Sequence, residues 1–264
     1  MLNRIVEETR QAVALQKLVR PYALLDRELA PGQLALRAAI SQQEWTLIAE
    51  CKLASPAKGT LCTHYTVPEL ADIYAHYGAA ALSVHTNAAF RGNLTDIALV
   101  KQAAGLPVLC KEFIIDEYQI YAARAAGADA VLLIAAILTD AELSLFLRIA
   151  ADLGMDALVE VHTLAELQRV QQTDAKLVGI NNRDLKTFMT SIEQTLNLLP
   201  YCQSDRLIIS ESGIKSRQDA LRLKQAGVKG ILVGEGLVTA SDIGVMTSEL
   251  ALRDPAKEGR NHNA

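Results

Sequence analysis

Short runs of apolar residues recur along the chain, separated by longer stretches in which apolar positions repeat with helical spacing. The runs are almost continuously hydrophobic instead of alternating, which is typical of strands covered on both faces. We therefore predict eight strands with helices between them. The strands are predicted at residues 46–49, 81–84, 107–110, 130–134, 157–161, 177–180, 207–210 and 230–233.

The stretches between these runs carry helix start and stop signals. Thr139-Asp140-Ala141-Glu142 places acidic residues in a first turn and predicts a helix that reaches Gly154. Thr163-x-x-Glu166 and Ser216-x-x-Asp219 resemble capping boxes. Other helical stretches end in a glycine just before the next run, where a left-handed residue commonly stops a helix. These glycines are Gly78, Gly127 and Gly227.

Eight βα units in about 200 residues predict a (β/α)8 TIM barrel. A doubly wound open sheet is the alternative, but no GxGxxG pattern follows the first strand. Residues 1–45 predict a helical extension, with helices over 7–18 and 33–43 and a break at Pro21. Because no linker or change in composition marks a boundary, we predict one domain over 1–264. In it, about 1–45 are appended helices and about 46–250 form the barrel.

Composition excludes several classes of protein. Half of the residues are hydrophobic and 21% are charged, unlike a disordered chain. With a net charge of −4 and 5% aromatic residues, the chain has no broad basic field and few stacking residues that would attract nucleic acid or an anionic membrane. The N-terminus is charged too early for a signal peptide, and the four cysteines form no CxxC pair. We expect a cytoplasmic protein with no nucleic-acid, membrane or metal partner.

Charged residues gather where the predicted strands end, which is where (β/α)8 barrels carry their active sites. Glu50 and Lys52 alternate with Cys51, so both charges face the barrel mouth if the thiol packs outward. Glu160 lies inside an apolar run, where a carboxylate is costly unless it is paired. A solvated loop residue is the alternative for each lysine that follows a strand. Further strands end in Lys111, Asn181, Arg183 and Glu211.

Glycine-containing turns follow the last two predicted strands. Ser212-Gly213 and Gly234-Glu235-Gly236 offer bare backbone amides, and these two loops form the usual phosphate site of such barrels. Ordinary tight turns are the alternative. The pattern predicts a phosphorylated substrate bound at Ser212, Gly213, Gly234 and Glu235.

Six motifs together resemble those of the indole-3-glycerol phosphate synthase family, and the resemblance covers nearly the whole chain. The motifs lie at 50–59 (ECKLASPAKG), 111–120 (KEFIIDEYQI), 158–162 (LVEVH), 179–185 (GINNRDL), 210–214 (SESGI) and 232–235 (LVGE). The resemblance implies ring closure, decarboxylation and dehydration of 1-(2-carboxyphenylamino)-1-deoxyribulose 5-phosphate in the tryptophan pathway. It implies no cofactor. We also expect a weak association with other enzymes of that pathway.

The resemblance further assigns roles to site residues. Lys111 would protonate the ketone oxygen during ring closure, and the acid–base groups of dehydration fall on Glu160, Lys52 and Glu50. We expect a lowered lysine pKa to suit proton donation near neutrality. Asn181 would orient a hydroxyl or Glu160. Substrate binding falls on Ser55, Phe90, Phe113, Leu132, Arg183, Leu185 and Glu211.

Among these binding residues, Arg183 and Ser55 would fix anionic groups, whereas the four apolar ones would wall the aromatic pocket. Core packing is the alternative for the apolar four. The segment 85–93 (HTNAAFRGN) departs from the family pattern, because it is one residue shorter and has one aromatic, Phe90, in place of two. Asp is also usual at Glu112. Because of these departures, two alternatives stay open: an altered substrate range, and a role in a secondary pathway.

Two other functions compete with this lyase. Another phosphate-binding barrel, such as an isomerase of the same or the histidine pathway, would lack Glu-x-Lys in the first strand together with Lys-x-Phe in the third. A non-catalytic barrel that only binds the substrate would be expected to lose Lys111 or Glu160. Both residues are present.

Overall fold

The computed structural model describes residues 2–25, 29–184, 187 and 189–253. Eight parallel strands close into a barrel in the order β1, β10, β9, β8, β7, β6, β5, β4. The predicted TIM barrel is therefore confirmed, and the open sheet is wrong. The strands are β1 (Thr46–Cys51), β4 (Ala81–His85), β5 (Val108–Lys111), β6 (Ala130–Ile134), β7 (Asp156–Val161), β8 (Leu177–Asn181), β9 (Leu207–Glu211) and β10 (Gly230–Val233).

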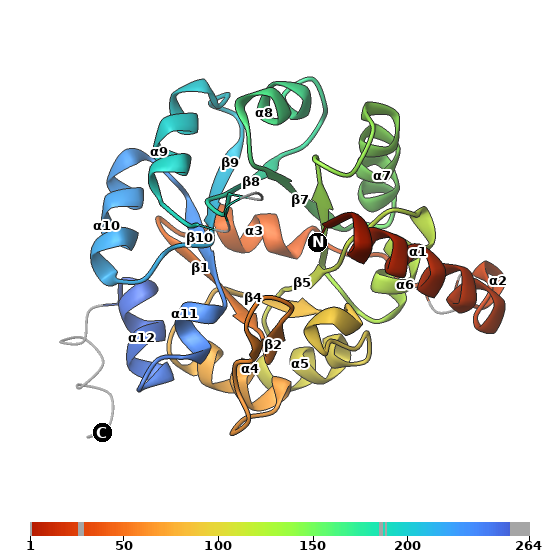
Figure 1. Ribbon diagram of the computed structural model, residues 1–264, viewed down its shortest axis with the longest axis horizontal. Helices are drawn as coiled ribbons and strands as arrows, with labels where there is room; N and C mark the ends of the chain where they lie inside the picture. Colours follow the sequence, from red (N-terminus) through yellow and green to blue (C-terminus); the bar gives the residue numbers. More distant parts are fainter. Residues whose placement is uncertain (1, 26–28, 185–186, 188, 254–264) are drawn as a thin grey trace.

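Helices surround the strands in a ring (Figure 1). They are α4 (Val67–His76), α5 (Asp96–Ala104), α6 (Glu117–Ala125), α7 (Asp140–Asp152), α8 (Leu164–Val170), α9 (Glu193–Leu198), α10 (Arg217–Ala226), α11 (Glu235–Val238) and α12 (Ile243–Leu250). The loops add two short turns, η2 (Ala88–Phe90) and η3 (Leu199–Tyr201), and a hairpin of β2 (Ala54–Ser55) and β3 (Gly59–Thr60). Within the described part of the chain, no helix is both long and apolar enough to cross a membrane.

Before β1, the described residues form α1 (Leu2–Val19), α2 (Tyr22–Leu25) and α3 (Ala35–Ser41). The predicted helical extension is therefore present, and the four-residue α2 is an addition after Pro21. Leu36 and Ile40 of α3 are fully buried against residues that begin strands, such as Ala81 and Ala130. Helix α3 thus closes the amino end of the barrel, and Figure 1 shows it inside the ring of helices.

The three predicted helix starts are real, but only one is a complete capping box. Thr139 caps α7 with bonds in both directions. Thr163 accepts from the amide of Glu166, whereas the Glu166 carboxylate accepts from the amide of His162, one residue before the cap. Ser216 behaves in the same way.

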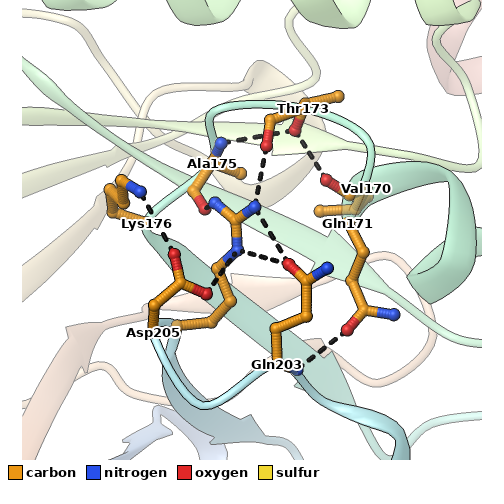
Figure 2. A network of polar contacts seen from close by, with 8 residues as sticks. Val170, Gln171, Thr173, Ala175, Lys176, Gln203 and Asp205 are labelled. Atoms are coloured by element: carbon orange, nitrogen blue, oxygen red, sulfur yellow. Dashed lines mark hydrogen bonds and ion pairs between the residues drawn. The ribbon is translucent and has the colours of Figure 1, made fainter.

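A buried arginine ties the amino ends of β8 and β9 together. The Arg206 guanidinium donates to the carbonyls of Thr173 and Ala175 and to Gln203 Oε1, and its side chain is 8% exposed. Figure 2 shows these acceptors converging from the loop before β8 and the loop before β9. Contacts at this end of a barrel contribute to stability, because barrels of this class carry their active sites at the other end.

The strand side chains build two separate cores. Inward residues such as Ile48 and Leu232 fill the barrel, whereas outward residues such as Leu47 pack against the helices. Cys51 belongs to the outer core, and Glu50 therefore points inward above Ile48. Alternation along β1 places its charge at the carboxyl end of the barrel, as predicted.

Candidate active site

A cavity of about 610 Å³ opens at the carboxyl ends of the strands. Leu2 and Ile5 of α1 form part of its wall, so the N-terminal helix covers this end of the barrel. Leu185 lies outside the described residues. Every other predicted site residue lines this cavity: Glu50, Lys52, Ser55, Phe90, Lys111, Phe113, Leu132, Glu160, Asn181, Arg183, Glu211, Ser212, Gly213, Gly234 and Glu235.

Lys111, the last residue of β5, bridges two buried carboxylates. Its Nζ lies 2.6 Å from Glu211 Oε2 and 3.2 Å from Glu160 Oε2. Burial alone would lower the pKa of Lys111, but the Glu211, Glu160 and Glu50 carboxylates outweigh burial and hold the pKa above its usual value. The predicted lowering of the lysine pKa is therefore wrong for Lys111, because its neighbours are anions.

The two carboxylates beside Lys111 differ in their pKa values. Burial acts to raise the pKa of Glu160, but Lys111 and His162 overcome it and lower the pKa. Burial raises the pKa of Glu211 to about 7, with Lys111 opposing and Glu160 adding to the rise. Glu160 is therefore ionised at neutral pH, whereas Glu211 can hold or release a proton there. Sequence reasoning assigned Glu211 to binding alone.

Gly179 in β8 makes room for Glu211. A Cβ at Gly179 would collide with Glu211 Oε1. That oxygen is buried and has no hydrogen-bond partner among the described residues. The bare backbone of Gly179 thus allows the carboxylate to lie against β8 while its other oxygen contacts Lys111.

Glu50 at the end of β1 belongs to a second charged cluster. Its Oε1 lies 3.2 Å from His85 Nε2 and 3.5 Å from Lys52 Nζ. Burial alone would raise the pKa of Glu50, but His85 and Lys52 hold it well below the usual value. A Cβ at Gly234 would collide with the same Oε1, so this glycine is needed by Glu50 whether or not an anion binds nearby.

Aromatic rings line the cavity beside Glu50. Phe90 stacks on His85 with ring centroids 4.3 Å apart and an interplanar angle of 2°. Phe113 lies 6.2 Å from Phe90, and Lys52 Nζ lies 5.4 Å above the Phe90 ring. Leu132 lines the cavity and also belongs to the inner core, so packing accounts for part of its position.

His85 and His162 are not among the predicted site residues. His162 Nε2 lies 3.4 Å from Glu160 Oε1, and its Nδ1 lies 3.6 Å from Glu166 Oε2. His85 and His162 each lie one residue beyond the predicted end of a strand. That position is the sequence signal that could have identified them as site residues. Burial works to lower the pKa of His162, but Glu166 and Glu160 prevail and raise it.

Glu112 holds the short segment 85–93 in place. Its carboxylate accepts from Thr86 Oγ1 at 2.9 Å, Asn87 Nδ2 at 2.7 Å and the Phe113 amide at 2.8 Å. The Asn87 amide also reaches Thr9 of α1 at 3.2 Å. The departure at Glu112 and the shortened segment are therefore in direct contact, and they fix the turn that carries Phe90.

The turn after β9 depends on a buried asparagine. Ser212 and Gly213 have φ values of 65° and 75°, so both lie in the left-handed region. Asn182, 3% exposed, donates to the Ser212 carbonyl and to Ser210 Oγ, both at 2.9 Å. Asn182 thus orients the turn, whereas the Asn181 side chain helps to lower the pKa of Glu160.

The remaining polar residues line the rim. Lys58 Nζ lies 2.5 Å from Glu235 Oε1, joining the β2–β3 hairpin to the start of α11. Ser55 Oγ accepts from the Lys58 amide at 3.2 Å. The Arg183 amide donates to Asn181 Oδ1 at 3.0 Å. Lys58 and Arg183 line the cavity together with the turns at Ser212-Gly213 and Gly234-Glu235.

This fold and cavity define a (β/α)8-barrel enzyme whose charged groups lie at the carboxyl ends of the strands. A family model of indole-3-glycerol phosphate synthase matches residues 2–250. The indole-3-glycerol phosphate synthase of Desulforamulus reducens is 48% identical over 257 residues, covering 96% of this chain and 97% of the relative. That of Albidiferax ferrireducens is 43% identical, covering 95% and 97%. The chain belongs to the indole-3-glycerol phosphate synthase family.

Solved structures of other barrels share the fold. A 3-hexulose-6-phosphate synthase has a TM-score of 0.65 at 18% identity, covering 78% of this chain and 98% of that one. A thiamine phosphate pyrophosphorylase from Pyrococcus furiosus has a TM-score of 0.59 at 16% identity, covering 80% and 95%. Family membership decides the function: the protein is a carboxy-lyase of tryptophan biosynthesis that forms indole-3-glycerol phosphate from a phosphorylated substrate. The alternative barrel functions are wrong.

Proposed function

We propose that Lys111 donates the proton that drives ring closure in this reaction. The observation that carries the proposal is one buried ammonium held between two carboxylates of different pKa. As the substituted aromatic carbon attacks the ketone carbon, the ketone oxygen takes a proton from Lys111 Nζ and becomes a hydroxyl. The bond to the carboxylate then breaks, carbon dioxide leaves, and its bonding electrons restore the aromatic ring.

Glu211 returns the proton to Lys111. Its Oε2 is 2.6 Å from Lys111 Nζ, and its pKa of about 7 lets it carry a proton at neutral pH. Such a short contact supports proton exchange without movement of the backbone. Lys111 is thereby an ammonium again before dehydration begins.

Dehydration uses the remaining charged groups. Lys52 protonates the departing hydroxyl while the Glu50 carboxylate, 3.5 Å away, holds its ammonium in place. The ionised Glu160 accepts the proton lost from the neighbouring carbon. Asn181 orients Glu160 through its side-chain amide. One water leaves, and the pyrrole double bond forms.

The substrate spans the cavity. Phe90, Phe113 and Leu132 wall its aromatic ring, whereas Arg183 and Ser55 fix anionic groups. Its phosphate binds the amides of Ser212, Gly213, Gly234 and Glu235, which border the cavity after β9 and β10. Leu185, which lies outside the described residues, keeps its predicted role in substrate binding.

Fluorescence of the indole product, measured with synthetic substrate, tests Lys111. Lys111→Ala should reduce kcat by roughly 10²–10⁴-fold, the usual contribution of a positioned general acid. Lys101→Ala is the matched control, because Lys101 also pairs with a carboxylate, Asp129 at 2.8 Å, but does not line the cavity. A Lys111→Ala enzyme within about tenfold of the parent would remove Lys111 from the mechanism.

We also propose a cytoplasmic location and a weak association with other enzymes of the tryptophan pathway. The four cysteines, all in the described part of the chain, are unpaired thiols, which supports a reducing compartment. The outer end of α1 exposes Leu15, Leu18 and Val19 at 64%, 80% and 83%, a surface that supports transient contact. Cell fractionation tests the first proposal. Sedimentation with the purified enzymes that make the substrate and use the product tests the second.

A further inference from the structure

His85 ends β4 in a buried position between two parts of the site. Its Nε2 lies 3.2 Å from Glu50 Oε1, and its ring stacks on Phe90 at 4.3 Å. We propose that His85 is a positioning residue that couples the aromatic wall of the cavity to the Glu50–Lys52 cluster. This inference rests on the proposed role of Glu50 in dehydration.

The neighbouring strands confine the Glu50 carboxylate from two sides. Strand β1 lies between β10 and β4 in the barrel. On the β10 side, the bare backbone of Gly234 lies against Glu50 Oε1, and on the β4 side His85 Nε2 faces the same oxygen. Lys52 Nζ is the third neighbour, at 3.5 Å. Removing the imidazole nitrogen would free the carboxylate on the β4 side and loosen its alignment with Lys52.

The face of the same imidazole supports Phe90. The two rings are parallel within 2°, whereas Phe113 is tilted by 31° and lies 6.2 Å away. Phe90 is the sole aromatic residue of segment 85–93, so the histidine ring supplies the second layer of that wall. Aromatic pairs of this kind stabilise beyond simple burial.

The segment between the two rings is held rigidly enough for this coupling. Thr86 and Asn87, which follow His85, are both bound to the Glu112 carboxylate, at 2.9 Å and 2.7 Å. The Asn87 Oδ1 accepts from the Ala89 amide at 3.0 Å and starts the turn that carries Phe90. These bonds hold Phe90 against the His85 ring, so a change in that ring alters the support of Phe90 directly.

Two substitutions separate the functions of the ring and the nitrogen. His85→Phe keeps a ring to stack on Phe90 but loses the contact with the Glu50 charge, so kcat should fall roughly tenfold or more while KM stays within about threefold. His85→Gln keeps a polar donor but loses the stack, so KM should rise about fivefold with kcat within about threefold. Steady-state fluorescence of the product measures both values.

Control variants exclude a merely structural effect. His76→Phe and His76→Gln make the same changes at an exposed histidine outside the cavity and should leave both constants unchanged. Melting temperatures of all variants are measured, and kinetics are taken well below each. If a His85 variant fails to fold, Phe90→Leu removes the stack from the other side and should raise KM as His85→Gln does.

The inference is overturned if both His85 variants change kcat and KM by the same factor, if only their melting temperatures fall, or if Phe90→Leu has a normal KM. Glu50→Gln separates this result from the proposed role of Glu50. An active Glu50→Gln enzyme refutes that role itself. An inactive Glu50→Gln enzyme beside a His85→Phe enzyme with normal kcat refutes only the coupling through His85.

Discussion

Lys111 Nζ lies closer to Glu211 than to Glu160, at 2.6 Å against 3.2 Å. The pKa values run the other way: Glu211, the closer carboxylate, is the one whose pKa rises, because its side chain is only 1% exposed and burial outweighs the lowering by Lys111. Lys111 therefore keeps a partner even when Glu160 loses its charge.

Glu160→Gln should lower kcat by roughly 10²–10⁴-fold with little change in KM, because it removes a proton acceptor and keeps the volume. Its melting temperature should fall only slightly, since Lys111 still contacts Glu211 at 2.6 Å. Steady-state kinetics beside thermal melting measure the two effects. Glu193→Gln, in an exposed pair with Arg222, is the control. A large loss of stability with near-normal kcat would instead make Glu160 a structural ion-pair partner.

Glu211 should make folding stability fall as the pH rises. Its pKa is about 4.5 in the unfolded chain and about 7 in the folded protein, so the folded state binds more protons between these values. The contribution is fully present below about pH 4.5 and is lost as the pH rises through 7. Urea unfolding at pH 5 and pH 8 should show a smaller loss of unfolding free energy in Glu211→Gln than in the parent. Equal losses would contradict the raised pKa.

Inorganic phosphate should compete with substrate at the turns after β9 and β10. Gly234 is a poor position for testing this, because any Cβ there would also displace Glu50. At Gly236 a Cβ would lie 3.2 Å from the Ile214 carbonyl oxygen and 3.3 Å from Val233, away from Glu50. Gly236→Ala should therefore raise KM and the inhibition constant of phosphate several-fold and in parallel, with kcat unchanged. A change in one constant alone would argue against a shared phosphate site.

Arg206→Met should lower the free energy of unfolding by about 2–4 kcal/mol, because it leaves the buried carbonyls around the guanidinium without their charged donor. The kinetic constants should not change, since Arg206 directly precedes β9 at the amino end of the barrel, whereas the cavity opens at the carboxyl ends. Denaturant unfolding and steady-state kinetics check both statements. Arg222→Met, at an exposed pair, should cost far less stability.

The apolar runs by themselves determined the strands and the barrel, because strands covered on both faces must be hydrophobic along their length. Period-two alternation likewise placed Glu50 and Lys52 on the face of the strand opposite Cys51. Continuous hydrophobicity and period-two alternation are both local properties, because each depends only on residues that are neighbours in the chain. The complete helix cap at Thr139 is of the same kind.

Only the tertiary structure decided which charges meet. Lys111 contacts Glu160, which lies 49 residues further along the chain, and Glu211, which lies 100 residues further along. The combined charge of the two carboxylates reverses the expected direction of the pKa shift of Lys111. Gly179 and Gly234 are needed because carboxylates from other strands lie against them. His85 likewise contacts a carboxylate from another strand, Glu50, and also stacks on Phe90. Electrostatic and steric effects depend on distance through space, and barrel closure sets those distances.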